Sequence, residues 1–89
     1  MGKTVREQWE DIYDECVEAD FNYKGRKYLL DLGGRPAYVY DCTDLKKGER
    51  LSEKNIIATY NSKEEFYNSY LFGIPILKVF DEAVITIHW

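Results

Sequence analysis

The sequence has few of the residues on which enzymes and metal sites most often depend. His88 is its only histidine, and its two cysteines, Cys16 and Cys42, stand far apart with no CxxC pairing. Such a set lacks the ligand spacing of a zinc site, and neither a GxGxxG nor a GxxxxGKS/T phosphate loop occurs. The sequence therefore predicts no cofactor and no metal, and it favours a protein that is not an enzyme.

Long apolar runs are also missing. No stretch approaches the roughly 20 apolar residues that a membrane-spanning helix needs, and the first residues, MGKTVREQWED, contain no apolar signal-peptide core. Without a secretory signal, the two cysteines are expected to stay reduced and to pack as small apolar groups. We therefore expect a cytoplasmic protein that does not enter a membrane.

Acidic residues, by contrast, are plentiful but confined to one part of the chain. Residues 1–20 hold seven acids against Lys3 and Arg6, a net charge of −5, whereas residues 21–89 hold nine acids and ten bases. At 89 residues the chain has the length of one small domain. We expect residues 1–89 to form a single α+β domain with one core, to which its 16% of aromatic residues contribute.

The acidic segment predicts an amphipathic helix over residues 3–18, with Trp9 as its main anchor. Its apolar positions recur at the helical period: Val5, Trp9, Ile12, Tyr13, Cys16 and Val17. The opposite side carries the residues that we call the acidic ridge: Glu7, Asp11, Asp14 and Glu18, flanked by Glu10 and Glu15. Such a face either keeps the protein soluble or meets a basic partner.

From residue 21 the period changes to two, which is typical of strands. The predicted strands cover residues 21–23, 26–32, 37–42 and 55–60. Lys24–Gly25 is expected to form the tight turn of a hairpin. Tyr38, Tyr40 and Cys42 share one face of the third strand, and a polar loop is expected over 43–54.

A second helix is predicted from Ser62 through about Phe72. Ser62 and Glu65 have the spacing of a capping box, in which each side chain accepts a hydrogen bond from the other's backbone. Gly73 is expected to end the helix in the left-handed conformation, and Pro75 cannot continue it.

Two β-rich runs, PILKVF (75–80) and AVITIHW (83–89), predict a terminal hairpin. In the second run Trp89 is expected to lie in the core and His88 to point outward. The first run or its neighbour is expected to be an exposed sheet edge, which Lys78 would protect in the first run. Self-pairing at such an edge leaves a homodimer open.

These elements follow the order α-β-β-β-(β)-α-β-β. We therefore expect the α+β class, as a two-layer sandwich of a mainly antiparallel sheet with two helices packed on one face. The α-β-β-β-α part is also the order of double-stranded-RNA-binding domains, but those present lysines where this chain has SKEEF (62–66). With a pI near 4.9, direct nucleic-acid binding is not expected.

Candidate chemistry is restricted to the end of the third strand. Asp41, Cys42 and Asp44 precede the long loop, with Lys46 and Lys47 close enough in sequence to activate a thiol. A small enzyme or ligand-binding domain that uses His88, Asp41 and Cys42 is therefore one alternative function.

The leading hypothesis is a non-enzymatic binding or regulatory module that acts through protein–protein contact. The nominated contact residues are Glu7, Asp11, Asp14, Glu18, Tyr38 and Tyr40. The partner is expected to be a protein, and the acidic ridge favours a basic one. A further alternative is an acidic inhibitor of a basic nucleic-acid-handling enzyme.

Overall fold

Short helices and strands follow one another in the computed structural model, which describes residues 4–34 and 36–88. Trp89 and the side chain of Val5 lie outside this description. The elements are, in chain order, α1 (Val5–Glu15), β1 (Glu18–Tyr23), β2 (Arg26–Asp31), β3 (Ala37–Asp41), the 3-10 helix η1 (Glu53–Asn55), β4 (Ile56–Tyr60), α2 (Lys63–Tyr67), β5 (Tyr70–Leu71), β6 (Ile74–Pro75), α3 (Ile76–Glu82) and β7 (Val84–His88).

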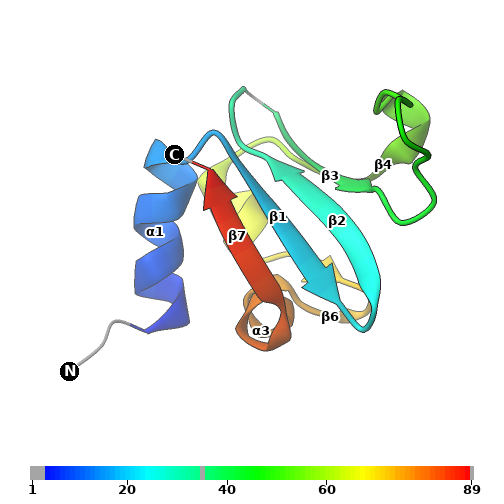
Figure 1. The fold of residues 1–89 in the computed structure, drawn as a ribbon. Helices are drawn as coiled ribbons and strands as arrows, with labels where there is room; N and C mark the ends of the chain where they lie inside the picture. Colours follow the sequence, from blue (N-terminus) through cyan, green and yellow to red (C-terminus); the bar gives the residue numbers. More distant parts are fainter. Residues whose placement is uncertain (1–3, 35, 89) are drawn as a thin grey trace.

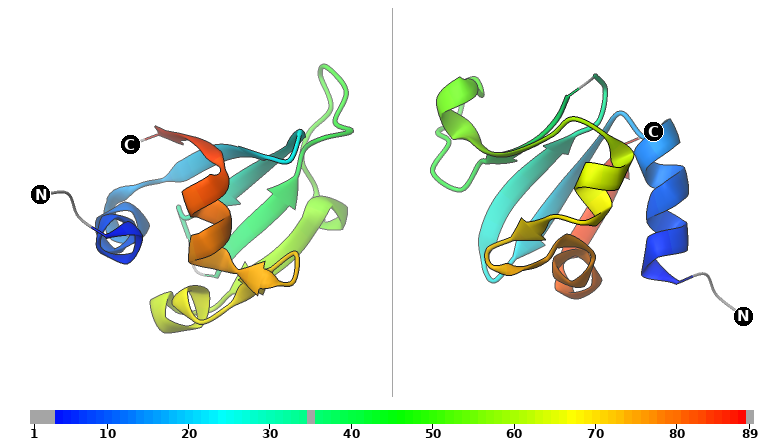
Figure 2. Two further views of the ribbon diagram at one scale, coloured as in Figure 1. Left: turned by 90° about the horizontal axis from the view of Figure 1, so that it is seen from below. Right: turned by 180° about the vertical axis from the view of Figure 1, so that it is seen from behind.

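The main sheet has the strand order β4-β3-β2-β1-β7, and all of its neighbouring strands run antiparallel. The α-helices of the described chain lie together on one face of this sheet (Figures 1 and 2). This arrangement confirms the predicted α+β class and its two layers. The helical layer differs from the prediction, because α3 adds a third helix to it.

Aromatic side chains fill the space between the layers. Phe66 of α2 is fully buried, and its ring centre lies 5.1 Å from that of Tyr13 and 5.2 Å from that of Tyr60. The ring of Phe80 stacks on Trp9 at 4.3 Å. Aromatic pairs contribute about 0.5–1.5 kcal/mol beyond the burial of their area. The high aromatic content therefore serves mainly this core, and Trp9 is the buried anchor that the sequence predicts.

Helix α1 is shorter than predicted. It ends at Glu15, so Val17 is 54% exposed instead of completing the apolar stripe, and Glu18 begins β1. Cys16 is buried. The chain turns here because the Cys16 backbone is already extended, and the period of two in the following residues suits a strand.

The prediction of a strand over PILKVF is wrong, because these residues form most of α3. Ile76, Val79 and Phe80 are buried, and their spacing at i, i+3 and i+4 puts them on one helical face. A short apolar run does not by itself distinguish a strand from a helix. Lys78 is an exposed helical residue and protects no sheet edge.

The prediction that the second helix reaches Phe72 is also wrong. Helix α2 ends at Tyr67, and β5 and β6 form a small hairpin instead. Its turn is Phe72–Gly73, with φ of 57° and 75°. Gly73 thus has the expected left-handed backbone, but in a two-residue hairpin turn that needs positive φ at both positions. Lys24–Gly25 forms the predicted turn of the same kind, with φ of 51° and 79°.

The capping box at α2 is only half formed. The backbone N–H of Glu65 donates to Ser62 Oγ over 3.1 Å, as predicted. The Glu65 carboxylate, however, accepts from the backbone of Asn61 and not from Ser62. The reciprocal pair exists at α1 instead, between Thr4 and Glu7.

Strand β7 is confirmed as the last strand of the sheet, but it does not pair with residues 75–80. It lies antiparallel to β1, with Ile87 opposite Ala19. Ile85 and Ile87 are half-buried on the helical side, while Val84, Thr86 and His88 are exposed on the other. The edges of the main sheet are therefore β4 and β7.

Candidate functional site

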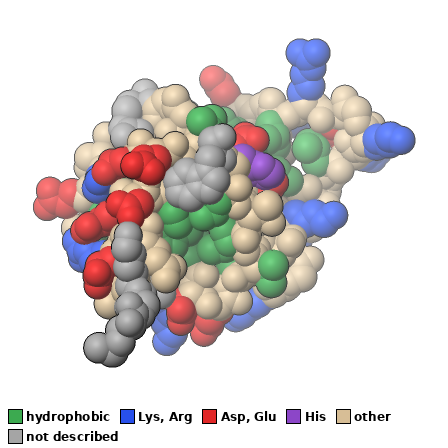
Figure 3. Space-filling model, turned by 60° about the vertical axis from the view of Figure 1, so that its left-hand side comes forward, with side chains coloured by type: hydrophobic (Ala, Val, Ile, Leu, Met, Phe, Trp, Pro, Cys, Tyr) green, Lys and Arg blue, Asp and Glu red, His purple; other side chains and the backbone are tan. Residues whose placement is uncertain are grey.

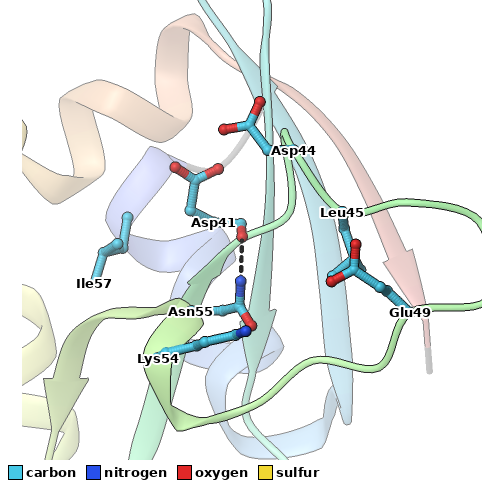
Figure 4. A pocket seen from close by; sticks show the side chains of 7 residues that line it. All are labelled: Asp41, Asp44, Leu45, Glu49, Lys54, Asn55 and Ile57. Carbon is cyan, nitrogen blue, oxygen red and sulfur yellow. Dashed lines mark hydrogen bonds between the residues drawn. The ribbon is translucent and has the colours of Figure 1, made fainter.

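The end of β3, where the sequence predicts chemistry, lies at the rim of a shallow pocket of about 220 Å³. The pocket is lined by Asp41, Asp44, Leu45, Glu49, Lys54, Asn55 and Ile57 (Figure 4). Three carboxylates and a lysine thus line one depression. Within the described residues, however, no group of three or more His, Cys, Asp or Glu side chains could hold a metal ion.

Asp41 is occupied with structural contacts. Its carboxylate accepts from the backbone N–H of Thr43 over 3.0 Å and pairs with the Arg26 guanidinium at 3.0 Å. The Thr43 hydrogen bond, followed by Arg26, lowers the pKa of Asp41 below its usual value despite partial burial. The side-chain amide of Asn55 reaches the Asp41 carbonyl at 3.5 Å (Figure 4). Asp41 therefore anchors the start of the long loop as a carboxylate.

Cys42 does not share this pocket. Side chains alternate along an extended chain, so its thiol points to the sheet face opposite Asp41. Burial raises the pKa of Cys42, and the charges of Asp20 and Asp41 raise it further. A thiol with a raised pKa holds little thiolate near neutral pH, which is the reverse of what a nucleophile requires.

His88 lies far from both residues. Its Nε2 is 2.8 Å from the Asp20 carboxylate on the neighbouring strand β1. Strands β1 and β2 stand between β7 and β3, which at the usual spacing corresponds to about 14 Å. The structure therefore does not bring His88, Asp41 and Cys42 into one site.

The acidic ridge is divided between two elements. Glu7, Asp11 and Asp14 are exposed on α1, whereas Glu18 lies on β1. Glu7 accepts hydrogen bonds from Thr4 in the capping box, and Asp14 pairs with Lys63 of α2. Part of the ridge is thus engaged in contacts within the helical layer.

Ala37 and Val39 of β3 are buried toward the α-helices. Because side chains alternate along a strand, Tyr38 and Tyr40 lie on the open face, by which we mean the sheet surface opposite the α-helices (the sheet and the helices are seen in Figure 2). Their ring centres are 6.1 Å apart. The strand registers place two rows of residues across this face. One row is Thr59, Tyr38, Asp31, Glu18 and His88, and the next is Ile56, Tyr40, Leu29, Asp20 and Thr86. Three of the nominated residues, Glu18, Tyr38 and Tyr40, therefore share the open face.

Carboxylates surround the two tyrosines. Asp31 lies beside Tyr38 in the register, and burial together with Asp31, Tyr38 and Glu53 raises the pKa of Tyr40. Asp20, Leu29 and Asp31 were not singled out from the sequence. The alternation in RKYLLD (26–31) carries the signal, because it assigns Leu29 and Asp31 to one face and the buried Tyr28 and Leu30 to the other.

A second depression, of about 510 Å³ and more apolar than the first, lies beside the β5–β6 hairpin. Tyr70, 68% exposed, and Phe72, 43% exposed, line it together with the Arg26–Asp41 pair. The sequence predicts a helix over both aromatic residues and therefore does not reveal this depression.

The chain is thus a two-layer α+β protein whose open sheet face carries tyrosines among carboxylates. No family model matches it, and no curated protein and no solved structure shows significant similarity to it. Within the described residues, no helix is both long and apolar enough to cross a membrane.

Proposed function

We propose that this chain is a protein-binding module that receives a basic segment of a partner protein on its open sheet face. The single observation that carries the proposal is the pair Tyr38 and Tyr40, side by side and half-buried on that face. Tyrosine is enriched at protein interfaces because it offers a large apolar ring with a polar end.

The charges around the pair support a cationic occupant. The two register rows hold Glu18, Asp20 and Asp31, and on this side of β2 the alternation places one base, Lys27. A lysine or arginine over a tyrosine ring gains about 0.5–2 kcal/mol from the cation–π interaction. Neighbouring carboxylates add attraction and steer the approach of the partner.

The same geometry supports the proposal of a non-enzymatic role. The side chains most suited to catalysis are dispersed, Asp41 is engaged by Thr43 and Arg26, and the Cys42 thiol has a raised pKa. We place the module in the cytoplasm, where its two free thiols, Cys16 and Cys42, would stay reduced.

A second candidate function is inhibition of a basic nucleic-acid-handling enzyme. The observation that favours it is the exposed acidic side of α1, formed by Glu7, Glu10, Asp11, Asp14 and Glu15. Pull-down from cell extract tests it. Recovery of such an enzyme by the wild type but not by the Glu10→Lys/Glu15→Lys variant supports this function. Equal recovery by the wild type and the variant contradicts it.

The open-face proposal is tested by NMR with two defined peptides. One is an acetylated eight-residue peptide of alternating glycine and arginine, and its control has glutamate in place of arginine. We expect saturable amide shifts at Leu29, Tyr38 and Tyr40 with the arginine peptide alone, weakened by added salt. Shifts confined to α1, or equal shifts with both peptides, contradict the proposal.

Variants then assign the contact. Tyr38→Leu/Tyr40→Leu keeps apolar side chains on the sheet but removes both π faces, and we expect affinity to fall about tenfold. Tyr70→Leu is the matched control, because Tyr70 is exposed beside the β5–β6 hairpin. Thermal melts of all variants verify that each remains folded.

A further inference from the structure

Among the described residues, strand β7 forms one edge of the main sheet and has no further strand on its outer side. Within the described chain β7 pairs only with β1, so alternate N–H and C=O groups of β7 point outward. Its sequence VITIH contains none of the usual protections of an edge, such as lysine or proline. The register of β7 with β1 is regular, whereas the other edge strand, β4, carries a bulge near Tyr40.

An apolar groove lies directly beside this edge. It has a volume of about 260 Å³ and lies between β7, α1 and α3. Its apolar lining consists of Trp9, Ile12, Phe80, Ile85 and Ile87. Figure 3 shows this hollow as an apolar patch with acidic side chains along one side.

Helix α1 extends past the sheet. In Figure 1 it lies beyond β7 on the side away from β1, and Figure 2 shows the same overhang. A strand added to β7 would therefore lie over α1, with its inward side chains on the groove and its backbone paired with β7. Strand addition of this kind derives affinity from the main chain and specificity from alternate side chains.

The charges beside the groove indicate which partner fits. Gln8 lines it, and Asp11 and Glu15 follow at i+3 and i+7 on the same side of α1. Asp81 lines the groove at the end where β7 begins. A second copy of this chain is a poor occupant, since two-fold pairing would bring its own acidic α1 beside this one.

We propose that the groove between α1 and β7 binds an extended, basic segment of a partner protein, which adds to β7 as a further strand. About five residues match the length of β7. Alternate side chains of the segment are apolar and contact Ile12 and Ile87. Its lysines or arginines point to the other face of the added strand, and the negative charges of Glu15 and Asp81 attract them through space. This groove lies on the helical side of the sheet and does not depend on the open-face proposal.

The test uses a seven-residue peptide of alternating lysine and valine with blocked ends. In an extended chain, all residues whose side chains share a face also direct their N–H groups to one edge. Two analogues, N-methylated at every lysine or at every valine, therefore each block one edge. We expect one analogue to bind as tightly as the parent peptide. The other should lose affinity by about tenfold or more, because it can no longer donate several backbone hydrogen bonds to β7, each of about 1 kcal/mol.

Hydrogen exchange locates the contact. We expect alternate amides of Val84–His88 to gain protection when the parent peptide is added. Equal binding of the two analogues overturns strand addition. So does peptide-induced protection at Tyr38 and Tyr40 in place of β7, or a dimer in sedimentation whose β7 amides are protected without peptide.

Charge variants test the assignment of a basic partner. Glu15→Lys/Asp81→Lys should weaken binding of the parent peptide about tenfold at low salt. Glu49→Lys/Glu64→Lys is the matched control, because it makes the same charge change at exposed positions away from the groove. Equal weakening by the two pairs overturns the assignment. Tyr38→Leu/Tyr40→Leu should leave this binding unchanged, which separates it from the open face.

Discussion

His88 of β7 contacts Asp20 of β1 diagonally, with His88 Nε2 2.8 Å from Asp20 Oδ2. Both side chains are about half exposed, at 45% and 59%. The only histidine of the sequence is thus engaged with a carboxylate on the open sheet face, one strand away, and not with the residues at the end of β3.

We predict that His88→Ala changes the free energy of unfolding by less than about 1 kcal/mol, since polar contacts between exposed side chains contribute little. Denaturant titration at neutral pH measures this, with Asp20→Asn as the partner variant. If both substitutions cost little stability and their effects do not add in the double variant, the two residues form a single weak contact. A loss of several kcal/mol on His88→Ala would show that the histidine has a structural role that its exposure does not explain.

Asp41 should make the free energy of unfolding depend on pH in the acid range. Its pKa is lowered in the folded protein, first by the Thr43 backbone hydrogen bond and then by Arg26. The stabilisation is therefore present above the unfolded-state pKa of about 3.9 and is lost as pH falls through the lower folded-state pKa. Asp41→Asn should be less stable at pH 7 and lose less stability below about pH 4. Denaturant midpoints across this range test it, with Asp44→Asn as the control.

The Cys42 thiol should react slowly. Burial raises its pKa, and the charges of Asp20 and Asp41 act in the same direction, so little thiolate is present at pH 8. We expect iodoacetamide to modify Cys42 more slowly than free cysteine, and Asp20→Asn to accelerate the reaction. Peptide mass spectrometry follows Cys42 separately from Cys16. Faster modification than free cysteine would reopen the nucleophile hypothesis.

Gly73→Ala should destabilise the protein by about 1 kcal/mol, because φ is 75° at this position and a Cβ is strained there. No atom lies within 4 Å of the added Cβ, so the cost is purely conformational. Gly34 offers the matched control, since it has the same free space without a left-handed φ. Gly34→Ala should stay within about 0.5 kcal/mol of the wild type. Equal melting of the two variants would contradict this account of the hairpin turn.

Several features follow from the sequence alone, because local chemistry decides them. The helical spacing of Trp9, Ile12 and Tyr13 requires one apolar face, and these residues are buried on α1. Lys24–Gly25 favours a two-residue turn, and strands flank it. The alternation in β7 correctly divides its side chains between the helical side and the open face.

Other features are decided only by tertiary structure. PILKVF has enough β-branched and apolar residues for a strand, but Phe80 reaches the rings of Trp9 and Phe21 when the run is helical. That contact is between residues distant in sequence, so no local pattern reports it. The same holds for β7, which pairs with β1 across more than sixty residues and so becomes an edge strand.

The candidate sites depend on the same long-range pairings. The sequence places Tyr38 and Tyr40 on one face of a strand, but only the register of β3 with β2 and of β2 with β1 sets Asp31 and Glu18 in line with them. Likewise, α1 is recognisable alone, whereas its groove beside β7 exists only because the two ends of the chain pack together. Local periodicity assigns a residue to a face, and strand order and helix packing decide which other residues share that face.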